Sequence, residues 1–441
     1  MSLLQKGQPV KAETLQNTLT VQYKLGEGGQ GEVYRITDGQ TAYALKWYNL
    51  EQSTEEQKNA IRYLVKQGAP IGPAGQRFIW PIDIITLDNS PQFGYLMPLI
   101  DTQRFAELGE IQAHRKPAPS LATLCEISYQ LANSYRALHL NGYCYRDIAA
   151  GNIMFDPNTG EVLICDNDNI GINRQSKTQV WGTLEYMAPE VIREEADPST
   201  ETDLHSLAVL LFNLWVWHHP LHGEMEYQIY IWDLPAKRRI YGEAPIFIFD
   251  PTDKRNQLPN DSEYHTASQR WKLCPPILQA LFIRAFTEGL HNPAQRVTEG
   301  EWQGLFLQLK DGMMTCPNCQ AENLWGEEPN NCWHCQTAIS IPPKLIFQYP
   351  SGQQHTVLLT QKQRLFQRHI QPASEQPHTV IGQVVQNPNN PDIWGIRNLM
   401  ETQWTATFSD GQTKIIEPQR AAPLNLGLKL NIGGIEAKIV A

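Results

Sequence analysis

The chain is poor in several features that would assign it to a specialised class of protein. It has only eight cysteines in 441 residues, too few for a disulfide-stabilised scaffold. Its most apolar run, from Leu207 to Trp217, is too short to span a bilayer and is expected to form a buried helix. The N-terminus has no long apolar stretch of the secretory kind, and no internal repeat or low-complexity tract occurs. We therefore expect a cytoplasmic protein without a membrane segment.

An excess of positive charge is also absent. The chain has 46 acidic and 36 basic residues, a formal net charge of -10 at pH 7, which argues against a nucleic-acid partner. Hydrophobic residues make up 41% of the chain, enough for sizeable cores and too many for wholesale disorder. A length of 441 residues predicts two or three domains.

Three regions differ in their sequence pattern. Residues 1–312 mix strand-like and long helical patterns, whereas residues 313–340 contain four cysteines in two close pairs. Residues 341–441 show short alternating strands, such as Trp404, Ala406 and Phe408 at period two, and Asp410-Gly411 predicts a turn. This last region is expected to be a small β-sandwich.

A glycine-rich loop lies near the start of the first region. The pattern G-x-G-x-x-G-x-V is formed by Gly26, Gly28, Gly31 and Val33. Glycines allow backbone N–H groups to approach phosphate oxygens, although a turn-rich hairpin would produce the same glycines. Strand-type residues follow the loop, so it joins two strands, and the second of the following strands carries Ala44 and Lys46. A lysine inside an apolar strand beside such a loop is suited to contact phosphate.

These residues resemble the eukaryotic-type protein kinase family, and later segments match that family in the correct order. Residues 145–152 match the catalytic loop, residues 163–166 the strand before the metal-binding aspartate, and residues 182–190 the end of the activation segment. Residues 202–207 resemble the start of the buried αF helix, and residues 292–296 supply a late arginine. The resemblance implies a two-lobed kinase fold, with an N-lobe of about residues 1–98 and a C-lobe of residues 99–312.

The resemblance also implies roles for individual residues. Asp147 would accept the proton of the substrate hydroxyl, Lys46 would contact the phosphates of ATP, and Asn152 and Asp166 would hold Mg²⁺ or Mn²⁺. Met97 in the predicted hinge would line the adenine pocket, with Val33 and Ala44 nearby.

Asp203 would hold the catalytic-loop backbone, and Arg296 would pair with Glu190. Phosphorylation candidates in the activation segment are Ser176, Thr178 and Thr183, of which Thr183 is expected to contact Asp147.

The chain departs from the family pattern at several positions. Tyr145 replaces the usual histidine, and Ala149 stands where serine/threonine kinases place a lysine. The metal motif reads Asp166-Asn167-Asp168 without the usual Phe and Gly, and Asp168 is expected to be a solvated loop acid or else a second metal ligand.

In the family a glutamate pairs with the lysine, and we expect it on a helix capped by Ser53. Glu56 is the candidate, although the apolar pattern favours Ala60 at that place. The resemblance implies an active ATP-dependent Ser/Thr protein kinase. Because of these departures, the alternative is a nucleotide-binding pseudokinase that acts as a scaffold or adaptor.

The cysteine pairs form a C-x₂-C-x₁₂-C-x₂-C pattern. The ligands are Cys316, Cys319, Cys332 and Cys335. Two such knuckles present four thiolates to one tetrahedral Zn²⁺ and leave no open position, so the zinc would be structural. A disulfide interpretation would need an oxidising compartment, which the N-terminus does not support. The segment resembles a zinc ribbon.

The C-terminal region resembles forkhead-associated domains, which bind phosphothreonine. Arg368, Ser374 and Asn398 are the phosphopeptide candidates by that resemblance, although Ser374 and His378 are one residue too far apart for the family motif. A β-sandwich that docks a partner or the kinase without reading phosphate is the alternative.

The predicted fold class is therefore α+β: a two-lobed kinase fold, a small zinc ribbon and an all-β sandwich. This arrangement is similar to kinases of the tellurium-resistance phosphorylation triad. That resemblance implies ATP, Mg²⁺ and Zn²⁺ as cofactors, a protein substrate, and a von Willebrand A-domain protein and a metal-dependent phosphatase as partners.

Overall fold

The computed structural model divides the chain into two compact units, Met1–Gln303 and Gly304–Ala441. It describes residues 3–16, 18–88, 90–174, 182–325, 331–361, 363–372, 374 and 376–441. The division falls before the expected kinase boundary at residue 312, within helix α11 (Glu299–Asp311). Both cysteine pairs and the predicted sandwich belong to the second unit.

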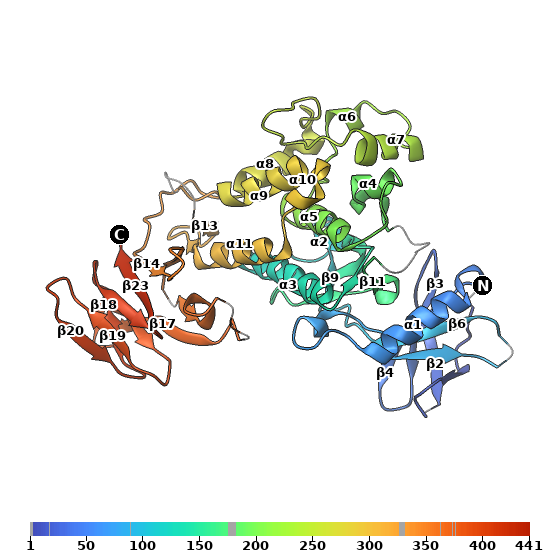
Figure 1. Ribbon diagram of the computed structural model, residues 1–441, viewed down its shortest axis with the longest axis horizontal. Helices are drawn as coiled ribbons and strands as arrows, with labels where there is room; N and C mark the ends of the chain where they lie inside the picture. Colours follow the sequence, from blue (N-terminus) through green and yellow to red (C-terminus); the bar gives the residue numbers. More distant parts are fainter. Residues whose placement is uncertain are drawn as a thin grey trace. The chain divides into compact units, whose positions relative to one another are not determined.

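The first unit begins with a closed β-barrel, drawn in blue in Figure 1. Its strands follow the order β1-β2-β3-β4-β6-β5. Alternating side chains point inward, and Tyr34, Ile36, Leu45 and Leu96 belong to the barrel core. The bounds are β1 Pro9–Ala12, β2 Leu19–Gly28, β3 Gly31–Thr37, β4 Ala42–Tyr48, β5 Asp83–Thr86 and β6 Phe93–Pro98.

Helix α1 (Glu55–Gln67) follows β4 and packs against the barrel through Ile61 and Leu64. The side chain of Thr54 caps its first turn by accepting a hydrogen bond from the backbone N–H of Gln57. The sequence pattern predicted Ser53 as the cap, and the observed cap lies one residue later, at Thr54.

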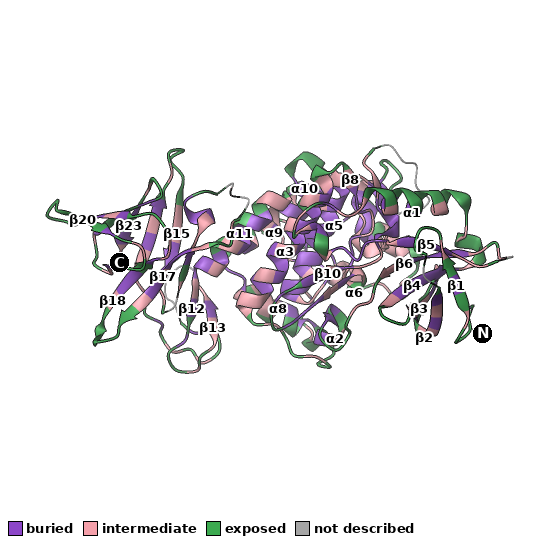
Figure 2. Cartoon of the chain, turned by 90° about the horizontal axis from the view of Figure 1, so that it is seen from below, coloured by how far each residue is buried: buried purple, intermediate pink, exposed green. Residues whose placement is uncertain are grey.

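A helical lobe forms the rest of the first unit. Helices α3 and α5 are largely buried (Figure 2), and the apolar run from Leu207 forms most of α5, as the sequence predicted. The longer helices are α3 Leu121–Leu140, α5 Thr200–Val216, α8 His265–Leu273 and α9 Pro276–Phe286. The shorter helices are α2 Leu108–Gln112, α4 Pro189–Ile192, α6 Glu224–Tyr227, α7 Leu234–Arg238 and α10 Glu288–His291. The catalytic loop and the metal-binding segment lie among short strands. These strands are β7 Ala106–Glu107, β8 Tyr143–Cys144, β9 Ile153–Phe155, β10 Val162–Ile164 and β11 Gly171–Ile172.

The second unit contains a short hairpin followed by a β-sandwich. The hairpin strands are β12 Met313–Thr315 and β13 Glu322–Leu324. One sheet of the sandwich has the order β15-β14-β23-β22-β19-β20 and the other β16-β17-β18-β21. Their shared core contains Trp404, Phe347, Leu430 and Ile396, so the expected all-β sandwich is present. The bounds are β14 Lys344–Gln348, β15 Gln354–Leu358, β16 Arg364–Phe366, β17 Val380–Asn387, β18 Asn390–Asn398, β19 Trp404–Thr407, β20 Thr413–Ile416, β21 Ala421–Pro423, β22 Lys429–Ile432 and β23 Ile435–Val440.

None of the described helices combines the length and the apolar character that a bilayer crossing requires.

Candidate active site

One face of the barrel gathers the predicted nucleotide-binding residues. Val33 pairs with Gly26 on one side and Lys46 on the other, and Ala44 pairs with Met97. Directly paired residues, and residues two apart on one strand, project from the same face of a sheet. The register therefore places these five residues on a common face, as a nucleotide pocket under the glycine loop requires.

The glycines of the loop serve two different purposes. A Cβ on Gly31 would lie 2.1 Å from the backbone oxygen of Trp47, so the close approach of β3 to β4 excludes a side chain there. A Cβ on Gly26 or Gly28 would meet no heavy atom within 4 Å. Packing explains Gly31 but not the other two, and the open space at Gly26 and Gly28 is compatible with a phosphate group.

Lys46 lies at the centre of the site. Its side-chain nitrogen is 2.8 Å from Oε1 of Gln30 in the glycine loop, 2.8 Å from Oδ2 of Asp168 and 3.4 Å from Oδ1 of Asp166. Burial opposes the charge, but the two carboxylates together raise the pKa of Lys46 above its ordinary value. Lys46 therefore remains a cation where ATP phosphates would need one.

The helix glutamate expected at this lysine is not there. Glu56 is exposed, and the ion pairs of Lys46 among the described residues are with Asp166 and Asp168. The α1 residue that faces the site is Gln57, whose side-chain nitrogen donates to the hydroxyl of Tyr48 at 3.2 Å. The prediction of Glu56 as the partner of Lys46 is wrong for this structure, because the turn of α1 directs the next residue inward.

The segment Asp166-Asn167-Asp168 also differs from the expectation. Asp168 is buried, so it is not a solvated loop acid. Asn167, in place of the usual phenylalanine, is buried too and donates to the carbonyl of Ile164 at 2.9 Å. A position where the family has glycine thus supplies a buried carboxylate, which the sequence alone did not reveal.

The backbone of the catalytic loop is held by Asp203 of α5. Its carboxylate accepts hydrogen bonds from the backbone N–H of Tyr145 at 2.6 Å and of Arg146 at 3.0 Å, as predicted. Arg146 has a φ of 72°, a conformation that costs free energy in a residue with a side chain. The two bonds to Asp203 stabilise that conformation next to Asp147.

Asp147 is oriented by two neighbours. The backbone N–H and the hydroxyl of Thr183 each donate to its Oδ1 at 2.8 Å, so the predicted contact with Thr183 is confirmed. The side-chain nitrogen of Asn152 donates to Oδ2 at 3.1 Å. Ser176 and Thr178, the other phosphorylation candidates, lie outside the described residues.

Asn152 and Asp166 form a donor set that fits Mg²⁺. The backbone oxygen of Asn152 accepts from the N–H of Cys165, at 2.8 Å, which places it next to Asp166. Asn152 donates to Asp147 through its amide nitrogen, so its amide oxygen is the atom that can ligate a cation. A carboxylate and an amide oxygen are ligands that Mg²⁺ prefers.

An ion pair between Arg296 and Glu190 stabilises the end of the activation segment. Nη2 of Arg296 is 2.8 Å from Oε2 of Glu190, which confirms the pair expected from the sequence.

Comparison with known proteins agrees with this geometry. The family model described as "Protein kinase domain" matches residues 19–264, more than half of the chain. The chain belongs to the protein kinase domain family.

Similar relatives of this kinase include serine/threonine-protein kinases from yeasts and a bacterium. The chain is 33% identical to sck2 of Schizosaccharomyces pombe over 105 residues (23% of this chain, 16% of the relative). It is 26% identical to SCH9 of Saccharomyces cerevisiae over 212 residues (47% and 25%). It is 24% identical to the DNA damage-responsive kinase RqkA of Deinococcus radiodurans over 246 residues (54% and 34%). These matches span between 16% and 34% of the relatives' own lengths, and each of the three relatives is described as a serine/threonine-protein kinase.

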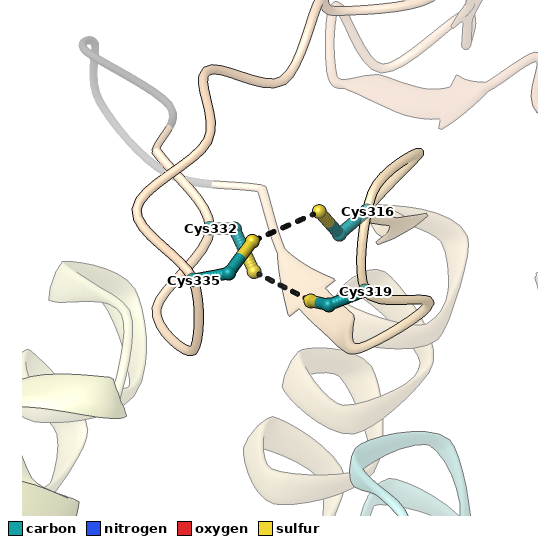
Figure 3. A group of neighbouring side chains, drawn as sticks. All are labelled: Cys316, Cys319, Cys332 and Cys335. Carbon is teal, nitrogen blue, oxygen red and sulfur yellow. Dashed lines mark hydrogen bonds between the residues drawn. The ribbon is translucent and has the colours of Figure 1, made fainter.

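The four cysteines after the kinase domain converge in space (Figure 3). Sγ of Cys316 lies 3.6 Å from Sγ of Cys335, and Sγ of Cys319 lies 3.5 Å from Sγ of Cys332. All four sulfurs lie within 4.8 Å of one another. A tetrahedral Zn²⁺ with bonds of about 2.3 Å separates its sulfur ligands by about 3.8 Å. The group is a possible metal site, and its spacing fits that ion.

The phosphopeptide candidates of the sandwich are engaged in internal contacts. Arg368 is buried, and its Nη2 lies 2.8 Å from Oδ1 of Asp311. Asn398 is fully buried and donates to the backbone oxygens of Thr402 at 2.8 Å and Ile416 at 3.1 Å. Ser374 is half-buried and accepts the N–H of Gln376. The prediction that Arg368 and Asn398 read phosphate is wrong in this structure, because both side chains are buried and bound to internal partners, Arg368 to Asp311 of α11 and Asn398 to backbone oxygens of the sandwich.

Proposed function

We propose that the chain is an active ATP-dependent kinase that phosphorylates serine or threonine in a protein substrate. The observation that carries the proposal is the convergence of Lys46 and Asp166, which are 120 positions apart in sequence, beside the linked pair Asp147 and Asn152. Together they supply a cation, a metal-ligand set and a carboxylate acceptor, the parts that phosphoryl transfer needs.

The tasks of phosphoryl transfer are then divided among these residues. Lys46 binds phosphate oxygens as a point charge, and Asn152 and Asp166 would hold Mg²⁺, which neutralises charge on the phosphates when bound. Thr183 and Asn152 fix the direction of the Asp147 carboxylate, so a substrate hydroxyl meets an oriented acceptor for its proton. A cavity of about 530 Å³, lined partly by Ala150, Gly151 and Tyr186, offers space next to the catalytic loop for a substrate segment.

A labelled-ATP assay with Mg²⁺ or Mn²⁺ tests the proposal. Wild-type protein should phosphorylate itself or a mixture of candidate proteins, and Asp147→Ala and Lys46→Ala should each lower the rate by about 100-fold or more. The exposed residues Lys66 and Asp392 provide matched controls, since Lys66→Ala and Asp392→Ala remove the same types of side chain at exposed positions. Equal labelling of all five proteins would contradict the catalytic assignment. ATP binding without any transfer would support the pseudokinase scaffold instead.

We also propose that the four clustered cysteines bind one structural zinc ion, as in a zinc ribbon. Buried Cys316 and Cys332 and half-buried Cys319 and Cys335 supply four thiolate ligands and leave no open coordination position. Purified protein should contain about one zinc ion per chain, and Cys316→Ser with Cys335→Ser should remove it. Cys274→Ser, at a buried thiol of the helical lobe, is the matched control and should retain the zinc. Metal-free wild-type protein would contradict the ribbon.

For the sandwich we propose partner docking that does not read phosphothreonine. The internal contacts of Arg368 and Asn398 favour this alternative over the forkhead-associated function. The candidate partners remain a von Willebrand A-domain protein and a metal-dependent phosphatase, by resemblance to the tellurium-resistance triad. Binding of these two proteins to the full chain, measured with phosphorylated and unphosphorylated forms, should not depend on phosphate. A strict requirement for phosphothreonine would contradict the proposal.

A further inference from the structure

The carboxylate of Asp168 is the most deeply buried charge in the active site. Its side chain is 0% exposed, and Oδ2 receives two donors: Nζ of Lys46 at 2.8 Å and the hydroxyl of Tyr48 at 2.5 Å. A carboxylate is retained in such a place only when its partners compensate for the lost hydration. Asp168 and Lys46 are thus mutual counter-ions inside the protein.

Asp166 cannot perform the same task throughout the reaction. Its side chain is 45% exposed and lies 3.4 Å from Lys46, a longer contact than that of Asp168. In the proposed function this carboxylate is needed as a metal ligand. A buried lysine still requires a negative partner when Asp166 is committed to the metal, and Asp168 can remain in place.

Helix α1 provides an uncharged side chain where a carboxylate was expected. Gln57 donates to the hydroxyl of Tyr48 at 3.2 Å and to the backbone oxygen of Asp168 at 3.4 Å. Its neighbours Glu55 and Glu56 are both exposed. The helix therefore supports the Tyr48–Asp168 pair and leaves the charge of Lys46 to be balanced from the metal-binding segment.

We propose that Asp168 is the positioning residue for Lys46, in place of a carboxylate on α1. The proposal rests on the proposed kinase function. The metal-binding segment then combines two tasks within a few residues, because Asp166 would hold the metal ion and Asp168, in the turn Asn167–Asn169, positions the lysine. Among the described residues, Gln57 connects α1 to the partners of the lysine, through the hydroxyl of Tyr48 and the backbone oxygen of Asp168.

Steady-state kinetics of single variants test this assignment. Asp168→Asn should lower kcat by about 100-fold at saturating ATP, as expected when a phosphate-contacting group is misplaced. Tyr48→Phe, which removes one hydroxyl donor and little volume, should lower kcat by a smaller factor. Glu56→Gln and its neighbour Glu55→Gln should both retain the wild-type kcat, since both side chains are exposed.

A rescue experiment separates positioning from folding. Asp168→Gly restores the glycine of the family pattern but removes the counter-ion, and it should be as inactive as Asp168→Asn. Adding Gln57→Glu to Asp168→Gly places a new carboxylate on α1 near Tyr48, and kcat should recover by about tenfold or more. A variant that is merely unfolded would not be rescued by a second substitution at this position.

Three results would overturn the inference: wild-type kcat in Asp168→Asn, a loss in Glu56→Gln that equals the loss in Lys46→Ala, or recovery of Asp168→Asn by raised Mg²⁺. The last result would make Asp168 a metal ligand. If the wild-type protein transfers no phosphate, the proposed function fails by itself. Titration with ATP then still tests the inference, because Asp168→Asn and Lys46→Ala should weaken ATP binding by the same factor.

Discussion

Asp203 and Asp311 are buried carboxylates, one in each unit, that hold different kinds of partner. Asp203 accepts from the backbone N–H groups of two catalytic-loop residues. Asp311, at the end of α11, accepts from three side chains: Arg368 at 2.8 Å, His355 at 2.9 Å and His369 at 3.0 Å. Because Asp203 fixes the catalytic-loop backbone in addition to contacting the His139 side chain, whereas the described contacts of the Asp311 carboxylate are with side chains, we expect loss of Asp203 to affect catalysis and loss of Asp311 to affect stability.

The histidines beside these aspartates differ in charge. His139 is buried, which disfavours its cation, but Asp203 and Glu299 outweigh burial and raise its pKa to about 9. Burial lowers the pKa of His369, despite Asp311. The Nδ1 of His369 accepts the N–H of Phe366 at 3.2 Å, so its Nε2 carries the proton donated to Asp311. That tautomer disfavours a metal ion at Asp311. The surroundings therefore shift the pKa values of these two histidines in opposite directions.

The largest effect is expected at Asp311. Asp311→Asn leaves Arg368 buried without its charged partner and should lower the free energy of unfolding of the second unit by about 3–5 kcal/mol. Hydrogen exchange of the full chain, followed by mass spectrometry, can measure this in peptides from β14 to β23. If Asp311→Asn increased the exchange rate more in the first unit than in the second, the comparison of the two aspartates would be contradicted.

Asp203→Asn should produce the complementary result. Weaker acceptance of the Tyr145 and Arg146 N–H groups should misplace Asp147 and lower kcat by about 100-fold, equivalent to about 2.7 kcal/mol. ATP binding should change little, because Lys46 and the glycine loop are carried by the barrel. Single-turnover kinetics and ATP titration measure the two properties separately. Asp311→Asn serves as the control, and its rate per folded molecule should equal that of wild type.

The raised pKa of His139 predicts a pH dependence. A raised folded-state pKa contributes stability that is fully present below the ordinary value of 6.5 and is lost as pH rises through about 9. The first unit should therefore lose about 3 kcal/mol between pH 6.5 and pH 9.5 through this group. His139→Gln, which cannot become a cation, should remove that part of the slope in urea unfolding. An unchanged slope would show that His139 is neutral in the folded protein.

The smallest effect is expected for a surface ion pair. Lys429 and Glu436 lie 3.1 Å apart, and both side chains are about half exposed. Lys429→Ala should change the free energy of unfolding by no more than about 0.5 kcal/mol. This variant calibrates the hydrogen-exchange experiment on Asp311. A loss as large as that of Asp311→Asn would mean that burial does not distinguish the two contacts.

Much of the kinase site could be predicted because its motifs are local. Lys46, Asp147 and Asn152 were recognisable from a few neighbouring residues each, and the contacts of Thr183 and Asp203 followed from the family pattern. The same reasoning missed Asp168, because its burial depends on Tyr48 and Gln57, which reach it from β4 and α1. No short pattern contains that information.

The apolar pattern of α1 contains a signal that identifies its inward-facing polar residue. Gln57 precedes Ile61 by four residues and Leu64 by seven, so these residues share one face of α1 and point to Gln57 as the inward polar residue. The side-chain contacts of the sandwich could not be predicted in this way. Arg368 matched a binding motif by type, but its true partner Asp311 is 57 residues away and outside the predicted sandwich. Composition and periodicity predict layers, while the pairing of buried charges depends on the tertiary structure.

Tyr145, which stands where most kinases have histidine, has a consequence for how the site responds to its surroundings. Its hydroxyl donates to the backbone oxygen of Cys165, directly before Asp166, and its ring packs against Tyr135. Burial raises the pKa of Tyr145 well above its ordinary value, so this phenol stays neutral over the whole physiological range. An exposed imidazole, by contrast, has its ordinary pKa near neutrality. The hydrogen bond that joins the catalytic loop to the metal-binding segment therefore keeps its donor proton over this pH range.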